Sequence, residues 1–236
     1  PPRQDVPEAV RICKKAGIDV KMVTGDLKLT AQAIAERIGI WEPGDLVVDG
    51  KQFDAMSDDE LLEIMPKLRI IARVDPFQKA RIVALLQKLG KVVAMTGDGV
   101  NDSLALRDAD VGIAMGQRGT DIAKEASDIV LVDDNFGSIV RAVHWGRTLY
   151  ENVQKFLQFQ LTINLSALAI AFFSPLLALG VSVLRENGID ILPNADFKEL
   201  PLTILQLLWI NLIMDTLAAL ALSLEPKRDE LMSEPP

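Results

Sequence analysis

The chain has 236 residues, which is enough for one large domain or two small ones. Hydrophobic residues make up 49% of it and its mean hydropathy is +0.22, so we expect part of the chain to lie in a lipid bilayer. The net charge of −8 argues against a nucleic-acid-binding surface, and the single cysteine excludes an internal disulfide.

Short apolar runs alternate with helical patterns from residue 18 to residue 132, which predicts a doubly wound α/β domain with a parallel sheet. The predicted strands are 19–23, 69–72, 91–95, 110–115 and 128–132. The predicted helices are 6–15, 28–38, 57–66, 76–89 and 119–126, the third opened by a capping box at Ser57 and Glu60. Residues 41–50 are expected to form a turn-rich connection.

The most informative loop is the run 96–102, Thr-Gly-Asp-Gly-Val-Asn-Asp, which follows the strand predicted over 91–95. Gly97 and Gly99 let the backbone approach a phosphate closely, and Asn101 is expected to cap the helix that begins near Asp102. Asp98 and Asp102 lie at the carboxyl end of the strand, where open α/β sheets bind ligands. Their hard carboxylate oxygens suit Mg²⁺.

A second loop repeats this chemistry. Residues 22–26 read Met-Val-Thr-Gly-Asp, and residues 94–98 read Ala-Met-Thr-Gly-Asp. Carboxyl ends of parallel strands meet at one edge of a sheet, so we expect Thr24, Gly25 and Asp26 to face the same site as the loop at 96–102.

A long helix is predicted from Phe136, and its part over 156–184 has no charged residue. That run exceeds the roughly 20 residues needed to cross a bilayer, and Pro175 is expected to kink or end it. A polar loop and a second apolar stretch, 201–224, follow. Basic residues before the first span place that end on the cytosolic side, so the loop is expected to be extracytosolic.

Asp215 is the one acidic residue in the second apolar stretch. An ionisable group in a bilayer is costly, which favours a functional role. Asn211 lies four residues earlier on the same helix face, and Asn164 lies in the first span. Carboxylate and amide oxygens form a site for a hard cation. The alternative is that Asn164 and Asn211 only hydrogen-bond between helices.

These motifs resemble those of the P-type ATPases. The run 96–102 is similar to the hinge motif of that family, and residues 73–79 resemble the segment that carries its phosphate-facing lysine, here Lys79. The runs 158–162 and 209–217 resemble plasma-membrane-type calcium pumps in particular. Reticulum-type pumps have an acidic residue three positions after the first-span asparagine, where this chain has Ala167. The resemblance therefore implies one transported Ca²⁺ instead of two.

The resemblance also implies roles and partners. Thr24, Gly25, Asp26 and Lys79 would contact a phosphoryl group, and Asn101 would belong to the same catalytic loop. Asp98 would bind Mg²⁺, and Asp102 would support the hinge and also bind Mg²⁺. Asn164, Asn211 and Asp215 would coordinate Ca²⁺. The implied cofactors are ATP and Mg²⁺, and the implied partners are the lipid bilayer and further domains of a pump, with no nucleic acid.

The implied fold is a partial haloacid-dehalogenase-like (Rossmannoid) parallel sheet, then a stalk helix and a transmembrane hairpin. The expected divisions are a phosphorylation domain at 1–138, a stalk at 139–155, spans at 156–184 and 201–224, a loop at 185–200 and a cytosolic tail at 225–236. We expect an integral protein of the plasma membrane or of a vacuolar or other internal membrane, with 1–155 and 225–236 cytosolic.

The Asp-Lys-Thr-Gly-Thr phosphorylation signature of the family does not occur in this chain, and the first residue is not Met. We therefore expect a segment of a longer pump that is inactive alone. Three alternatives stay open: a pump for another cation such as Na⁺ or Mn²⁺, a membrane-anchored phosphatase of the haloacid-dehalogenase type, and a phosphate-binding module without catalysis.

Overall fold

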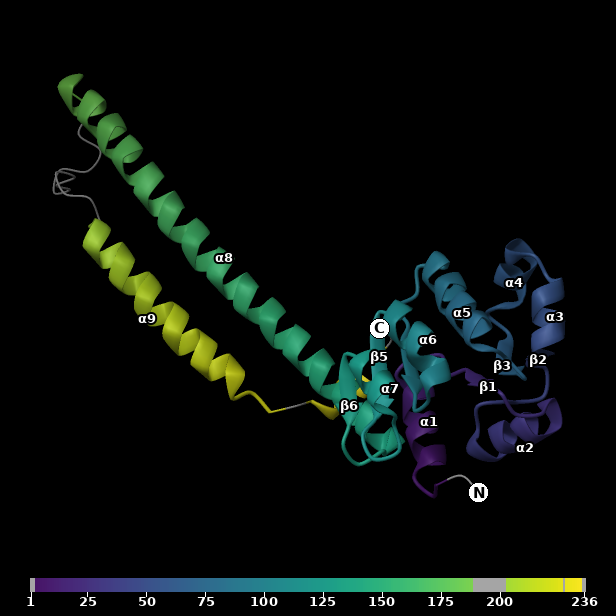
Figure 1. The fold of residues 1–236 in the computed structure, drawn as a ribbon. Helices are drawn as coiled ribbons and strands as arrows, with labels where there is room; N and C mark the ends of the chain where they lie inside the picture. The colour runs from purple at the N-terminus through teal and green to yellow at the C-terminus, as the bar shows by residue number, and fades with distance from the viewer. Residues whose placement is uncertain (1–2, 189–202, 227, 235–236) are drawn as a thin grey trace. The chain divides into compact units, whose positions relative to one another are not determined.

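The computed structural model describes residues 3–188, 203–226 and 228–234. The loop expected at 185–200 falls largely outside these described residues. The chain divides into two compact units, Pro1–His144 with Asp229–Pro236, and Trp145–Arg228. Figure 1 labels their helices and strands. Each unit is described below by itself.

The first unit holds a three-stranded parallel sheet in the order β1-β3-β2. Its strands are β1 (Met22–Thr24), β2 (Leu46–Asp49) and β3 (Leu68–Ala72). Four helices connect or follow them: α2 (Lys28–Ile38), α3 (Gly50–Ala55), α4 (Asp58–Ile64) and α5 (Pro76–Lys88). Strand β3 is central and almost wholly buried, as expected for a parallel strand covered on both faces. Phe53, Leu61 and Leu85 close the core on one side of it.

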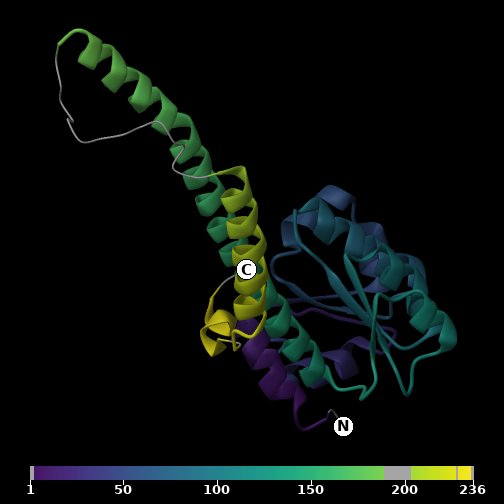
Figure 2. The ribbon, with the colours of Figure 1, turned by 90° about the vertical axis from the view of Figure 1, so that its left-hand side faces the viewer.

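A second parallel sheet in the same unit has the order β4-β5-β6. Its strands are β4 (Ala94–Gly97), β5 (Val111–Met115) and β6 (Ile129–Leu131). The short 3₁₀ helix η1 (Val100–Asp102) and the helices α6 (Ser103–Asp108) and α7 (Asp121–Glu125) lie between its strands in sequence. The two sheets are seen together in Figure 2. Val83 of α5 packs against Val93 and Ala105, so apolar contacts join the parts of the unit that carry the two sheets.

The helix α1 (Val6–Lys15) completes this unit together with the 3₁₀ helix η2 (Asp229–Ser233). Ala9 and Cys13 of α1 share a buried cluster with Val140 and Met232. Met232 is 6% exposed. The segment that follows the second apolar stretch therefore returns to the α/β unit and packs on its first helix.

Strand and helix alternate as the sequence predicts, and the predicted capping box at Ser57 is confirmed by hydrogen bonds in both directions between Ser57 and Glu60. The prediction of a turn-rich connection over residues 41–50 is wrong, because β2 and the first residue of α3 lie there. The run Leu46–Asp49 pairs with β3. Because this strand is short and directly follows the turn signal Pro43-Gly44, its sequence pattern does not indicate a strand. Strand β4 also begins later than predicted, since Val92 is exposed and pairing with β5 starts at Ala94.

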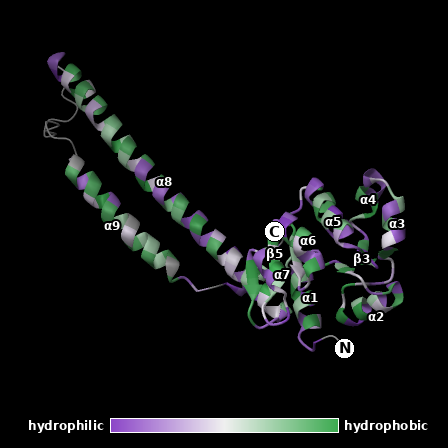
Figure 3. Ribbon diagram, in the orientation of Figure 1, coloured by the Kyte–Doolittle hydropathy of each residue, from purple (hydrophilic) through white to green (hydrophobic). Residues whose placement is uncertain are grey.

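The second unit contains most of α8 (Phe136–Glu186) and all of α9 (Ile204–Ser223). Both helices are long and apolar enough to cross a membrane, with mean hydropathies of 2.3 and 1.7 in their most apolar windows. Figure 3 shows the hydrophobic colouring along α9 and much of α8. Helix α8 continues past Pro175, so this proline does not end it.

An ion-pair cluster joins α8 to the chain after α9 within this unit. Lys155 pairs with Glu225 at 2.7 Å and with Glu151 at 3.3 Å, and Arg228 pairs with Glu151 at 2.7 Å. The Asn152 side chain donates to the Leu222 carbonyl oxygen at 3.1 Å. These contacts hold the part of α8 around residues 151–155 beside the end of α9.

The buried core of the first unit predicts a contrast between two phenylalanines. Phe53 is 0% exposed and Phe77 is 76% exposed. We expect Phe53→Ala to lower the free energy of unfolding by about 3–5 kcal/mol, because it leaves a cavity between α3 and the sheet. Phe77→Ala is expected to change it by less than about 0.5 kcal/mol. Urea unfolding of the purified chain in detergent, followed by tryptophan fluorescence, measures both values. Equal losses in the two variants would contradict this description of the core.

Candidate functional site

Two Thr-Gly-Asp sequences lie at the carboxyl ends of two strands that each pair on one side only. Thr24 is the last residue of β1, and Gly97 is the last residue of β4. Strand β1 pairs with β3 alone and β4 pairs with β5 alone, among the strands of the described residues. The motif loops therefore extend from the free edges of the two sheets.

The loop after β1 is closed by the loop after β3. The backbone N–H of Val74 donates to the Thr24 carbonyl oxygen at 3.2 Å, and that of Arg73 donates to the Asp26 carbonyl oxygen at 3.0 Å. The Asp26 N–H also donates to the Thr24 hydroxyl oxygen at 3.1 Å. Arg73 has a left-handed backbone with φ of 53°. Thr24 is half-buried while Gly25 and Asp26 are exposed, so this loop presents polar groups to solvent from a fixed backbone.

Asp102 organises the loop after β4. Its carboxylate is buried, at 7% exposure, and both oxygens have partners. Oδ1 lies 2.5 Å from Lys79 Nζ, and Oδ2 accepts the backbone N–H groups of Asp98 and Gly99 at 3.2 and 3.1 Å. Lys79 lies in the first turns of α5, which follows β3. The Asp102 carboxylate therefore connects Lys79, on the helix that follows β3, to the loop that follows β4.

The Asp98 carboxylate is the group in this loop that is available to bind a ligand. It is exposed, and within the described part of the chain its oxygens accept no hydrogen bond and make no ion pair. Its backbone is fixed, because the Asp98 carbonyl oxygen accepts the N–H of Thr120 at 2.9 Å. No cluster of three or more metal-ligating side chains occurs among the described residues. One carboxylate with substrate oxygens and water is nevertheless a common way to hold Mg²⁺, so the donor set fits that ion.

The expected cap at Asn101 is wrong. Asn101 is an exposed residue inside η1, and α6 begins only at Ser103, without a side-chain cap from Asp102. The buried Asp102 instead fixes the turn before η1, because its carboxylate accepts the N–H groups of Asp98 and Gly99.

Sequence reasoning missed Asp134, which lies just after β6. It is 6% exposed, and its two carboxylate oxygens accept the backbone N–H groups of Gln117 and Arg118, each at 3.0 Å. These hydrogen bonds hold the pKa of Asp134 below its usual value. The only sequence signal is the run Asp133-Asp134-Asn135, which by itself indicates a turn.

The predicted cation ligands are less completely described. Asn164 is exposed on α8 and Asn211 is half-buried on α9. Asp215 lies within α9, but its side chain is outside the described part of the structure. The predicted site formed by these three residues stays a prediction.

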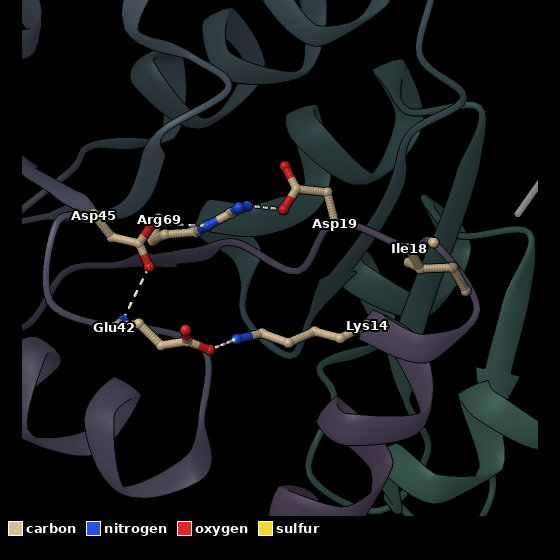
Figure 4. A pocket seen from close by; sticks show the side chains of 7 residues that line it. Lys14, Ile18, Asp19, Glu42, Asp45 and Arg69 are labelled. Atoms are coloured by element: carbon tan, nitrogen blue, oxygen red, sulfur yellow. Dashed lines mark hydrogen bonds and ion pairs between the residues drawn. The ribbon is translucent and has the colours of Figure 1, made fainter. Parts of the chain in front are cut away.

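A hollow of about 460 Å³ lies at the opposite, amino-terminal side of the first sheet (Figure 4). Its charged side chains are already paired. Lys14 contacts Glu42 at 2.5 Å, and Arg69 pairs with both Asp45 and Asp19. We interpret this hollow as a structural layer of ion pairs.

Lys21 is a buried member of the same layer. Its ammonium group donates to the carbonyl oxygens of Met65 and Leu68 and pairs with Asp19 at 2.9 Å. Burial lowers the pKa of Lys21 to about 8. The hydrogen bonds of Lys21 join the chain just before β1 to the turn before β3 and to the first residue of β3.

The packing of Gly97 against Asp102 yields a prediction. A Cβ at Gly97 would overlap Cβ and Cγ of Asp102, whereas a Cβ at Gly99 would lie 3.6 Å from Asp102 Oδ2. We expect Gly97→Ala to lower the free energy of unfolding by about 1–3 kcal/mol. Gly99, with φ of −108° and ψ of 165°, should accept alanine at a cost within about 0.5 kcal/mol. Thermal unfolding of the two variants makes the comparison, and a Gly97→Ala variant as stable as Gly99→Ala would refute the close packing.

Comparison with known proteins agrees with this geometry. A family model described as haloacid dehalogenase-like hydrolase matches residues 1–110, and one described as cation transporting ATPase, C-terminus, matches residues 199–236. Calcium-transporting ATPase PAT1 of Dictyostelium discoideum is 51% identical to this chain, and the match covers the whole chain and 22% of the length of PAT1. Calcium-transporting ATPase 2 of Schizosaccharomyces pombe is 48% identical to this chain, and the match covers the whole chain and 17% of the length of that relative.

Calcium-transporting ATPase 4, plasma membrane-type, of Arabidopsis thaliana is 47% identical to this chain, and the match covers the whole chain and 21% of the length of that relative. The chain thus spans about a fifth of the length of these relatives. The matches do not favour a separate phosphatase or a module without catalysis, since the relatives that match the whole chain are named as ATPases. Together with the parallel sheets, the two motif loops and the apolar helices, they show that the chain belongs to the cation-transporting P-type ATPases.

Proposed function

We propose that this chain is the part of an ATP-driven calcium pump that holds one half of the phosphorylation site and two of the transmembrane helices. The relatives that match it along its whole length are named as calcium-transporting ATPases. Because the chain spans only about a fifth of those relatives, ATP hydrolysis and transport would belong to a longer protein.

The observation that carries this proposal is the pair of free strand edges. Strands β1 and β4 each end in a Thr-Gly-Asp sequence, and each has one pairing partner within the described strands. Unpaired strand edges offer N–H and C=O groups to an added strand. A strand from outside this chain, lying between β1 and β4, would join the two sheets and bring a nucleophilic aspartate to the two loops.

Lys79 would neutralise the transferred phosphoryl group. Its ammonium carries three N–H donors, and the contact with Asp102 Oδ1 uses one of them, so two stay available for phosphoryl oxygens. Asp102 would fix the position of Lys79 and of the loop that contains Asp98. Phosphoryl transfer depends mainly on such positioning and charge neutralisation.

Thr24, Gly25 and Asp26 would contact the phosphoryl group from the other sheet. Their loop backbone is held by Arg73 and Val74, so the side chains of Thr24 and Asp26 would extend from a fixed backbone. Asp98 would hold Mg²⁺, which supplies positive charge at the phosphoryl oxygens. Asn101, exposed in η1 beside these residues, would contribute through its amide and not as a helix cap.

Asn164, Asn211 and Asp215 would bind the transported Ca²⁺ between the two apolar helices. Helix α8 begins in the α/β unit and continues into the apolar unit without a break, so it would carry conformational change from one site to the other. The proposed division is a phosphorylation domain at 1–138, a stalk at 139–155, spans at 156–184 and 201–224, and a tail at 225–236. Residues 1–155 and 225–236 would then be cytosolic.

The ion site predicts a selective loss of transport. In the full-length pump that contains this chain, we expect Asp215→Asn to reduce ATP-driven ⁴⁵Ca²⁺ uptake into vesicles to background, because a charged oxygen ligand is lost. Phosphorylation by inorganic phosphate should persist, since the loops of the α/β unit are unchanged.

Thr216→Val is the matched control, because the Thr216 hydroxyl already donates to the Leu212 carbonyl oxygen within the helix. We expect this variant to transport calcium. Uptake by the Asp215→Asn variant at the level of the control would exclude Asp215 from the ion site. Phosphorylation without calcium uptake in the unmodified pump would redirect the proposal to another cation.

A further inference from the structure

We propose that Asp134 is a positioning residue for Asp98, acting through the loop at residues 116–120, and this inference rests on the proposed role of Asp98 in holding Mg²⁺. Asp134 has a left-handed backbone, with φ of 49°, and is 6% exposed. A buried carboxylate in such a conformation needs several contacts to hold it.

The Asp134 side chain contacts the loop, and its backbone contacts Arg3 and the Leu131 carbonyl oxygen at the end of β6. The Asp134 carboxylate accepts the N–H groups of Gln117 and Arg118, each at 3.0 Å. The guanidinium of Arg3 donates to the Asp134 carbonyl oxygen at 2.7 Å. Asp134 therefore fixes two successive peptide groups of the loop while its own backbone is anchored from the other side.

The loop is also tightly packed where it leaves β5. The Gly116 N–H donates to the Leu131 carbonyl oxygen at 2.9 Å. A Cβ at Gly119 would overlap the Met115 carbonyl oxygen, so the turn closes on itself. Little freedom is left for the loop to move once Asp134 holds its centre.

The far end of the loop reaches the metal-binding aspartate. The N–H of Thr120 donates to the Asp98 carbonyl oxygen at 2.9 Å, and the N–H of Asp98 donates to Asp102 Oδ2 at 3.2 Å. Of the two peptide groups that flank the Asp98 Cα, one is thus held by Asp102 and the other by Thr120. Among the described residues, the exposed Asp98 carboxylate has no hydrogen-bond or ion-pair partner. Its orientation therefore depends on the position of this backbone.

Outer contacts that orient a metal ligand typically contribute about 10-fold to 100-fold to metal affinity. We therefore expect Asp134→Asn to raise the Mg²⁺ concentration that half-saturates phosphorylation of the full-length pump by inorganic phosphate about 10-fold or more. Asparagine accepts the left-handed backbone, so the variant tests the second carboxylate oxygen and its charge. The phosphorylation level at saturating Mg²⁺ should approach that of the unmodified pump.

Asp133→Asn is the matched control. Asp133 accepts hydrogen bonds from Asn135 and Ser138, lies on the surface, and does not contact residues 116–120 through its side chain. We expect its Mg²⁺ dependence to be unchanged. A lower maximal level with an unchanged Mg²⁺ midpoint in Asp134→Asn would assign Asp134 a purely structural role and overturn the inference.

A second pair of variants tests the final hydrogen bond directly and does not depend on the folding of Asp134→Asn. Thr120 has φ of −68°, which proline also adopts, and its hydroxyl caps α7. Thr120→Ala removes the cap and keeps the N–H that donates to Asp98, whereas Thr120→Pro removes both. We expect the Mg²⁺ midpoint to rise in Thr120→Pro and not in Thr120→Ala, and equal midpoints would overturn the inference.

The two proposals fail in different ways. If the unmodified pump and Asp133→Asn form no Mg²⁺-dependent phosphoenzyme, the proposed function is wrong. If the unmodified pump and Asp133→Asn both form the phosphoenzyme, the proposed function stands. If Asp134→Asn and Thr120→Pro then have the same Mg²⁺ midpoint as the unmodified pump, the positioning role of Asp134 is excluded.

Discussion

The contact between Lys79 and Asp102 is the interaction on which the rest of the site depends. It joins the helix after β3 to the loop after β4, and so links residues that belong to different sheets. Asp102 is 7% exposed, and its second oxygen accepts two backbone N–H groups. A buried carboxylate is tolerated only when its oxygens are satisfied in this way. Gly97 is required beside it, because any side chain there would displace Asp102.

This contact and the contacts within each loop explain how two sheets with unpaired edge strands can hold a defined site. Strands β1 and β4 both lack a second neighbour within the described strands, yet the loops at their ends are fixed by contacts outside the sheets. Arg73 and Val74 hold one loop, and Asp102 with the 116–120 segment holds the other. The loops are thus organised without an added strand, and the proposed strand would therefore join them at a lower entropy cost.

Much of the fold was predictable because its signals are local. The capping box at Ser57, the helix at 28–38 and the alternation of strands with helices depend on neighbours a few residues apart. The Thr-Gly-Asp loops were predictable because glycine and aspartate have specific uses at strand ends. Strand β2 was missed because four residues beside a turn signal give too short a pattern. Asp134 was missed because its partners lie 16 and 17 residues away, and no local rule links them.

The most direct test of the account is the structure of the full-length pump with Mg²⁺ and beryllium fluoride, which mimics a phosphoryl group on aspartate. The account predicts one added strand paired with both β1 and β4, Lys79 in hydrogen-bond contact with the fluoride, and the Asp98 carboxylate on Mg²⁺. A nucleophilic strand that joins neither edge, with Lys79 and Asp98 both away from the fluoride and the metal, would contradict it.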